Sequence, residues 1–262
     1  AMSFATMMAA AKASAQVEIE AGWGQGRASF GGLVAAVLLA RLSAEVPSDR
    51  RLRSLSVSFV GPVAPGPATL EATVFRSGKS VTQAEARLLQ NGEVQAVLLA
   101  SYGTHRESAV RVPSAVLTEI PVPANGRAMP YLPGRMPEFL QQFEMVWAEG
   151  GFPFSGQDKP DFMGSVRFRD TSAPFTLEHF VALVDAWPPS VLPMLSTLAP
   201  ASTLCWTLEL LEEALDPDPT AWWHYRVRTD LAADGYGHAE ARLWAADGRL
   251  VAVSRQTVTV FA

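Results

Sequence analysis

One carboxylate in this sequence lies on a helix face that is otherwise apolar. The side chains at the spacing of one buried helix face are Leu177, Phe180, Val181 and Val184. Four residues after Val181, the same face reaches Asp185. Because an ionised carboxylate is costly to bury alone, Asp185 should have hydrogen-bond donors, a raised pKa or a catalytic task. A carboxylate at a helix end can also simply reach water, so both interpretations stay open.

The helix that carries Asp185 has recognisable ends. Thr176 is a suitable N-cap, and Glu178 lies in the first turn, where the helix dipole favours a negative charge. Pro188 and Pro189 stop the helix, because proline cannot donate a backbone hydrogen bond. The sequence therefore predicts a helix between Thr176 and Pro188, with Asp185 near its C-terminal end.

Other residues that could do chemistry are few. The single cysteine, Cys205, excludes an intrachain disulfide, and no histidine close in sequence could activate it, so a buried structural thiol is expected. The four histidines lack the spacing of metal ligands, so no metal site is predicted. The sequence contains no G-x-S-x-G, which disfavours an α/β-hydrolase. The glycine-rich stretch 22–32 does not form G-x-G-x-x-G, so no dinucleotide cofactor is expected.

Composition narrows the class of protein. The 262 residues are 48% hydrophobic and 18% charged, enough apolar material for a large core. The net charge is −5 and no basic block occurs, which disfavours a nucleic-acid partner. The longest apolar run, 31–40, is too short to span a membrane. No positive charge precedes the apolar stretch 2–16, so a short docking helix is expected there rather than a signal peptide. A single cysteine fits a cytoplasmic location.

The remaining pattern consists of apolar helices and antiparallel strands. A helix at 33–44 is apolar nearly all round, as in a core helix. Strands are predicted at 16–21, 53–60, 68–76, 80–90 and 93–102, and again at 142–148, 164–169, 202–211, 222–231, 237–244 and 250–260. Asn91-Gly92 and Asp247-Gly248 are hairpin turns. Residues 105–137 are proline-rich without periodicity, which predicts a linker that runs over the surface.

The two halves also share a short run of identical residues. The run AEARL at 84–88 recurs at 239–243, an offset of 155 (239 minus 84), and the turn glycines Gly92 and Gly248 differ by 156 (248 minus 92). The order of predicted elements is the same in each half. We therefore expect an α+β protein with an internal duplication, divided into 1–104, a linker 105–137, and 138–262.

Three stretches give the chain a resemblance to a known family. They are Phe30-Gly31-Gly32 before the first core helix, the strand and Pro…Gly turn SLSVSFVGPVAPG at 54–66, and Arg76-Ser77-Gly78-Lys79-Ser80 between two strands. In this order they resemble acyl-CoA thioesterase II and its relatives. The resemblance implies a double hotdog fold, in which each of two repeats wraps an antiparallel sheet around a long core helix.

The resemblance also implies site residues. The family holds a water with Asp, Thr and Gln, and the matching positions are Asp185, Thr203 and Gln256. Substrate contacts are expected from Phe30, Gly31, Gly32, Arg76 and Gly78. After Thr203 the family usually continues with Asp-His-Ser, whereas this chain reads Cys205-Trp206-Thr207-Leu208-Glu209, which bears on substrate preference and on the assembly interface.

The chemistry of these side chains fits thioester hydrolysis. A carboxylate can accept the proton of a water that a hydroxyl and a carboxamide orient. If Thr203 corresponds to Ser54, an offset of 149, the same offset places Ala36 opposite Asp185, and the offset of 156 places Ala100 opposite Gln256, which predicts one site per chain. We therefore expect an acyl-CoA thioesterase and, by analogy with the family, a homo-oligomer. The alternatives are a non-catalytic acyl-CoA-binding protein and an enoyl-CoA hydratase, which usually has a histidine five residues after its Asp; position 190 is serine.

Overall fold

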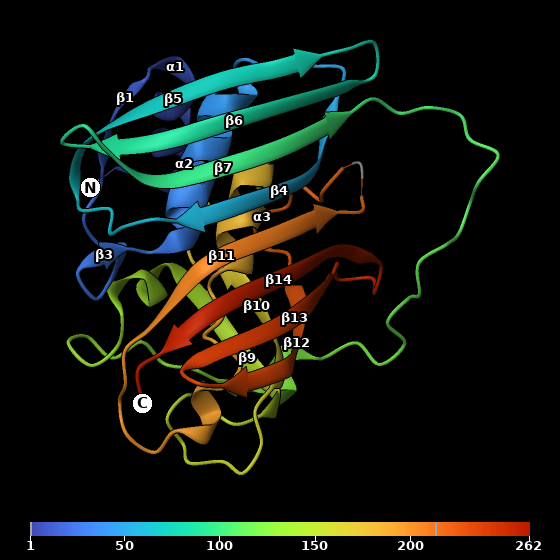
Figure 1. Ribbon diagram of the computed structural model, residues 1–262. Coiled ribbons are helices and arrows are strands. Elements are labelled where there is room, and N and C mark those ends of the chain that lie inside the picture. The colour runs from blue at the N-terminus through green and yellow to red at the C-terminus, as the bar shows by residue number, and fades with distance from the viewer. Residues whose placement is uncertain (1, 213) are drawn as a thin grey trace.

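The computed structural model describes residues 2–212 and 214–262. One antiparallel sheet forms its front, and the two helices α2 (Gly31–Ser43) and α3 (Leu177–Val184) lie behind it (Figure 1). Its strands lie in the order β1-β5-β6-β7-β4-β11-β14-β13-β12-β10-β9-β8. This arrangement confirms the α+β class.

The N-terminal half supplies the first five strands of that order. Their bounds are β1 Gln16–Ile19, β4 Arg51–Phe59, β5 Gly66–Ser77, β6 Val81–Gln90 and β7 Glu93–Gly103. A separate two-stranded sheet consists of β2 (Gly24–Gln25) and β3 (Ala28–Ser29) and leads directly into α2. The predicted strands are confirmed to within two or three residues at their ends.

The C-terminal half supplies the other seven strands. Their bounds are β8 Arg127–Ala128, β9 Phe143–Gly150, β10 Phe162–Phe168, β11 Ala201–Leu210, β12 Trp223–Ala233, β13 Tyr236–Trp244 and β14 Leu250–Val260. The 3-10 turns are η1 Pro123–Asn125, η2 Glu138–Gln142 and η3 Leu192–Met194. The two halves join where β11 pairs with β4, and Ser56 and Thr207 share a hydroxyl hydrogen bond there.

Two of the described helices begin at a capping side chain. The N-terminal helix α1 (Phe4–Ala13) begins at Ser3, whose hydroxyl accepts from the backbone N–H of Thr6, and it buries Phe4, Met7, Met8 and Ala11. This confirms the docking helix. Thr176 caps α3 by accepting from the backbone N–H of His179, and the helix stops at Val184 with Asp185 as its C-cap.

Helix α2 starts two residues earlier than predicted, at Gly31, and packs directly on α3. A side chain at Gly32 would put its Cβ 2.6 Å from the carbonyl oxygen of Ala182, so only glycine permits this approach. The contact brings the start of α2 beside the end of α3.

The proline-rich segment 105–137 contains no fully buried residue, but its first part is more exposed than its second. Residues 105–116 are exposed, and the segment projects away from the sheet after β7 (Figure 1). Leu117 then packs on Met163, Trp244 and Leu250, and β8 pairs with β9. Residues 129–137 are mostly exposed, but Met129, Leu132 and Met136 also line a cavity described below.

Among the helices of residues 2–212 and 214–262, none combines the length and the hydropathy that crossing a bilayer requires.

Candidate active site

Asp185 lies where the ends of two helices meet. It is half-buried as the C-cap of α3, and its carboxylate faces the first turn of α2. A Cβ at Gly31 would be 2.8 Å from Oδ2 of Asp185 and 3.0 Å from the ring of Phe59. Glycine at position 31 therefore leaves the room that the carboxylate occupies.

Gln256 holds the other oxygen of this carboxylate. Its Nε2 donates to Oδ1 of Asp185 over 2.7 Å. Strand β14 presents the amide toward the helix end, and the residues opposite Gln256 on its neighbouring strands are Trp206 and Ala239. The side chains 185 and 256 are thus in direct contact although 71 residues separate them.

The surroundings of Asp185 change its acidity. Burial raises its pKa from 3.8 to about 7, because the charged form loses water. The Gln256 donor and the backbone N–H of Gly32 act in the opposite direction, since both stabilise the charge. A carboxyl group with a pKa near 7 can both accept and return a proton at neutral pH.

Thr203 lies on β11 next to a bulge between Thr203 and Cys205. It pairs with Val258 and is half-buried. Asp185, Thr203 and Gln256 line the same cavity, so the fold brings the three sequence-predicted polar residues together.

That cavity is large and mostly apolar. Its volume is about 550 Å³, within the usual range for small-molecule sites of roughly 300–1,000 Å³. Much of its wall comes from the proline-rich segment and the loops around α3, including Met129, Leu132, Met136, Phe139, Leu140, Phe152, Phe154, Trp187 and Leu192. Sequence reasoning missed most of these residues, because they lie in the proline-rich segment and in loops where no helix or strand was predicted. The only signal was apolar side chains among prolines.

A second cavity of about 370 Å³ meets the first at Asp185 and Thr203. The N-terminal half supplies its far wall, with Ser29, Gly31 and Phe59. Asp185 therefore lies at a junction, with an apolar cavity on one side and a smaller cavity on the other. A ligand reacting at this point could extend in both directions.

Family models match both halves of the chain. Residues 19–104 match the acyl-CoA thioesterase N-terminal domain, and residues 121–260 match the acyl-CoA thioesterase C-terminal domain. The chain belongs to the acyl-CoA thioesterase family.

Solved structures share the fold of this chain. A hot-dog-fold protein of unknown function from Alicyclobacillus acidocaldarius has 24% identity and a TM-score of 0.81, over 94% of this chain and 92% of that one. A proposed thioesterase II from Thermobifida fusca has 26% identity and a TM-score of 0.77, over 94% and 92%. An acyl-CoA thioesterase II from Mycobacterium marinum has 17% identity and a TM-score of 0.72, over 94% and 93%. No curated protein matches the sequence.

The thioesterase fold does not gather every residue expected to touch substrate. Phe30 is fully buried and stacks on Phe139, with ring centroids 4.3 Å apart, so it packs in the core. Arg76 and Gly78 lie at the end of β5 and in the turn that follows, and neither lines a cavity that contains Asp185. The carbonyl of Gly78 instead accepts from Arg50.

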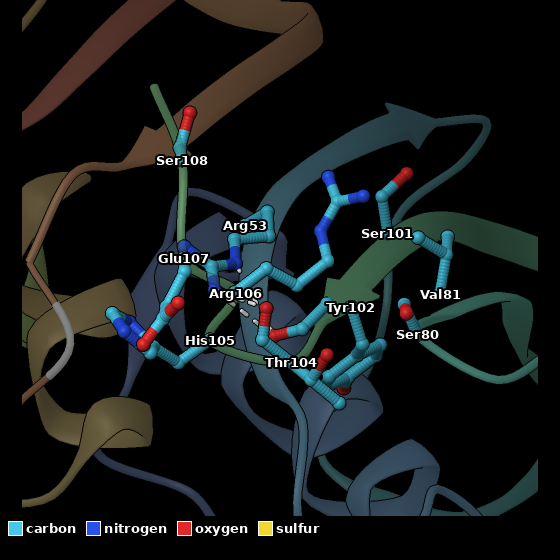
Figure 2. Close-up of a pocket in the computed structure, with 11 residues that line it drawn as sticks. Arg53, Ser80, Val81, Ser101, Tyr102, Thr104, His105, Arg106, Glu107 and Ser108 are labelled. Carbon is cyan, nitrogen blue, oxygen red and sulfur yellow. Dashed lines mark hydrogen bonds between the residues drawn. The ribbon is translucent and has the colours of Figure 1, made fainter. Parts of the chain in front are cut away.

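A polar hollow of about 550 Å³ lies near the start of β4, at the opposite end of that strand from Phe59 (Figure 2). Arg53 lines it and donates to the carbonyl oxygens of Gly103 and Thr104. These bonds fix the start of the linker. None of Asp185, Thr203 and Gln256 lines this hollow.

Two further reactive groups lie away from the junction. Ser165 and His224 share a 2.8 Å hydrogen bond, but both are buried, so the pair stabilises the core. Cys205 is exposed rather than buried. The expectation of a buried thiol was wrong, because the bulge beside it changes which side chains of β11 face inward.

Proposed function

We propose that the protein hydrolyses acyl-CoA thioesters to a free fatty acid and CoA, with a water held by Asp185, Thr203 and Gln256. The observation that carries the proposal is the Asp185–Gln256 hydrogen bond at the junction of an apolar cavity and a second cavity. The apolar cavity is suited to an acyl chain. The smaller cavity would admit the thiol portion.

The reaction balances with this chain's own groups. Asp185 accepts a proton as water oxygen bonds to the carbonyl carbon, and Thr203 and Gln256 orient that water. The carbonyl oxygen becomes negative and needs donors. When it reforms the double bond, the carbon–sulfur bond breaks, and the proton held by Asp185 goes to the leaving thiolate. Asp185 is then ionised again.

We also propose the finer architecture, a double hotdog of two repeats. The pairing registers support it. In the first half, Ala100 pairs with Leu55 on one neighbouring strand and with Ala84 on the other. In the second half, Gln256 pairs in the same way with Trp206 and Ala239. The shifts in strand register also recur at matching places. The shift between Leu52 and Ser54 matches the one between Thr203 and Cys205, and the shift at 74–76 matches the one at 229–231.

These registers correct the offset of 149 on which the counterparts of both Thr203 and Asp185 were based. The offset between β4 and β11 is 151 (206 minus 55), so Thr203 corresponds to Leu52 and not to Ser54. Gln256 still corresponds to Ala100. The first half thus has hydrocarbon at the positions of the hydroxyl and the amide, which supports one site per chain.

Substitution of Asp185 by asparagine tests the hydrolase. Asp185→Asn should lower turnover by at least a thousandfold, because asparagine cannot accept the proton, while the shape and the Gln256 contact permit folding. Thiol release from acyl-CoAs of several lengths measures turnover, and calorimetric titration with acyl-CoA measures binding. A parent protein that binds acyl-CoA without releasing thiol would indicate a non-catalytic binding protein instead. Equal turnover in variant and parent would remove Asp185 from the mechanism.

A further inference from the structure

Ser29 has a buried hydroxyl that the fold leaves without a partner. The residue is 7% exposed, and its Oγ is one of three buried side-chain polar atoms among the described residues that make no hydrogen bond. Its backbone is held, since the N–H donates to the carbonyl of Val63 over 2.7 Å. A buried hydroxyl without a partner is unfavourable, so such a group calls for an explanation.

The position of Ser29 beside a cavity explains why its hydroxyl has no partner within the chain. It ends β3, two residues before α2 begins, and it lines the smaller cavity together with Gly31, Thr203 and Asp185. Phe30, the N-cap of α2, provides no side-chain cap. The first N–H groups of a helix lack intrahelical partners, and the helix dipole makes this end favourable for negative charge. A hydroxyl donor and a helix start therefore border one cavity.

Resting on the proposed hydrolysis, we propose that Ser29 is an oxyanion donor: its hydroxyl hydrogen-bonds the carbonyl oxygen of the bound thioester as that oxygen becomes negative. One rotation about the Cα–Cβ bond redirects a serine hydroxyl without moving the backbone. Asp185 and Gln256 hold the water on one side of the carbonyl carbon, and Ser29 with the start of α2 faces the oxygen. The site would then take a donor from the N-terminal half and its base from the C-terminal half.

The test compares two buried serines. Ser29→Ala should lower kcat about ten- to a hundredfold and change KM less than twofold, because the lost bond strengthens only as charge develops. Its Tm should stay equal or rise, because an unpartnered buried hydroxyl is removed. Ser165→Ala removes a buried hydroxyl that is bonded to His224, so it should lower Tm and leave kcat unchanged.

The outcomes separate this inference from the proposed function. If the parent releases no thiol from any acyl-CoA, the proposed hydrolysis fails and Ser29 fails with it. If the parent is active and Ser29→Ala keeps kcat within twofold, only the assignment of Ser29 is overturned. A loss of Tm in Ser29→Ala, with activity falling only in proportion to the folded fraction, would also overturn it by showing a structural role.

Discussion

The surroundings of Asp185 shift its pKa in two opposite directions. Burial raises its pKa from 3.8 to about 7, whereas Gln256 and the N–H of Gly32 favour the charge. The folded chain thus holds the proton more tightly than the unfolded chain does. The contribution of Asp185 to the free energy of unfolding therefore falls as pH rises from about 4 to about 7, and it is constant above that range. The carboxyl group lowers stability at the pH where it can act as a base.

Removal of the Gln256 amide should reveal this coupling in the pH profile. In the parent, kcat should rise with pH through about 7 and then level off, because only ionised Asp185 accepts a proton. Gln256→Ala removes a donor that lowers the pKa, so the rising limb should move to higher pH and the plateau should fall about ten- to a hundredfold. Thiol release measured from pH 5.5 to 9 checks both. If the rising limb of the pH profile stayed at the same pH in Gln256→Ala, the amide would not act on the carboxylate.

At the scale of elements, the helix ends and the proline-rich segment build the site. Helix α3 ends at Val184 and presents Asp185 to the start of α2, and residues 129–137 close one wall of the apolar cavity. Residues in the wall formed by this segment can be substituted without changing the strands of the sheet. We therefore expect it to limit the length of the acyl chain.

Enlarging one side chain of this wall should shorten the preferred chain. Each buried methylene contributes about 0.8 kcal/mol, or roughly fourfold in kcat/KM. Met136→Trp should therefore lower kcat/KM for long acyl-CoAs more than tenfold and change it less than twofold for butyryl-CoA. Met194→Trp is the control, because Met194 is exposed and lies outside this lining. A uniform loss at all chain lengths would indicate a damaged fold instead of a filled cavity.

Periodicity was enough to predict the helix that carries Asp185 and nearly all the strands of the sheet. The stripe from Leu177 to Val184 predicted one buried face, but that detail was wrong, because Glu178, His179, Ala182 and Leu183 are buried as well and only Leu177 is partly exposed. The cavity could not be predicted in the same way, because prolines interrupt the segment of Met129, Leu132 and Met136, and the role of these side chains depends on which loop they meet. Phe30 shows the converse: its motif indicated substrate contact, yet the ring packs on Phe139.

At the scale of the molecule, one sheet unites both halves through β4 and β11. The peptide segment that connects the halves is exposed, in contrast to these paired strands. Residues 105–116 are exposed, with Val112 at 87%, and they belong to none of the described strands. Homo-oligomerisation stays a prediction from the family.

Limited proteolysis should cut this exposed stretch first. Trypsin has Arg106 and Arg111 available there, whereas the strands are protected by pairing. The two fragments should remain together in gel filtration without denaturant, because the β4–β11 ladder and the α2–α3 contact do not depend on the cut peptide. Fragments that separate at once would show that the linker holds the halves together.

The β4–β11 ladder is formed within a single polypeptide, and this has a consequence for very dilute solutions. An interface between separate subunits comes apart once their concentration falls below its dissociation constant, but tethered partners keep an effective concentration in the millimolar range. Gly31 from one half and Asp185 from the other should therefore stay together at nanomolar protein, so activity per molecule should not decline on dilution.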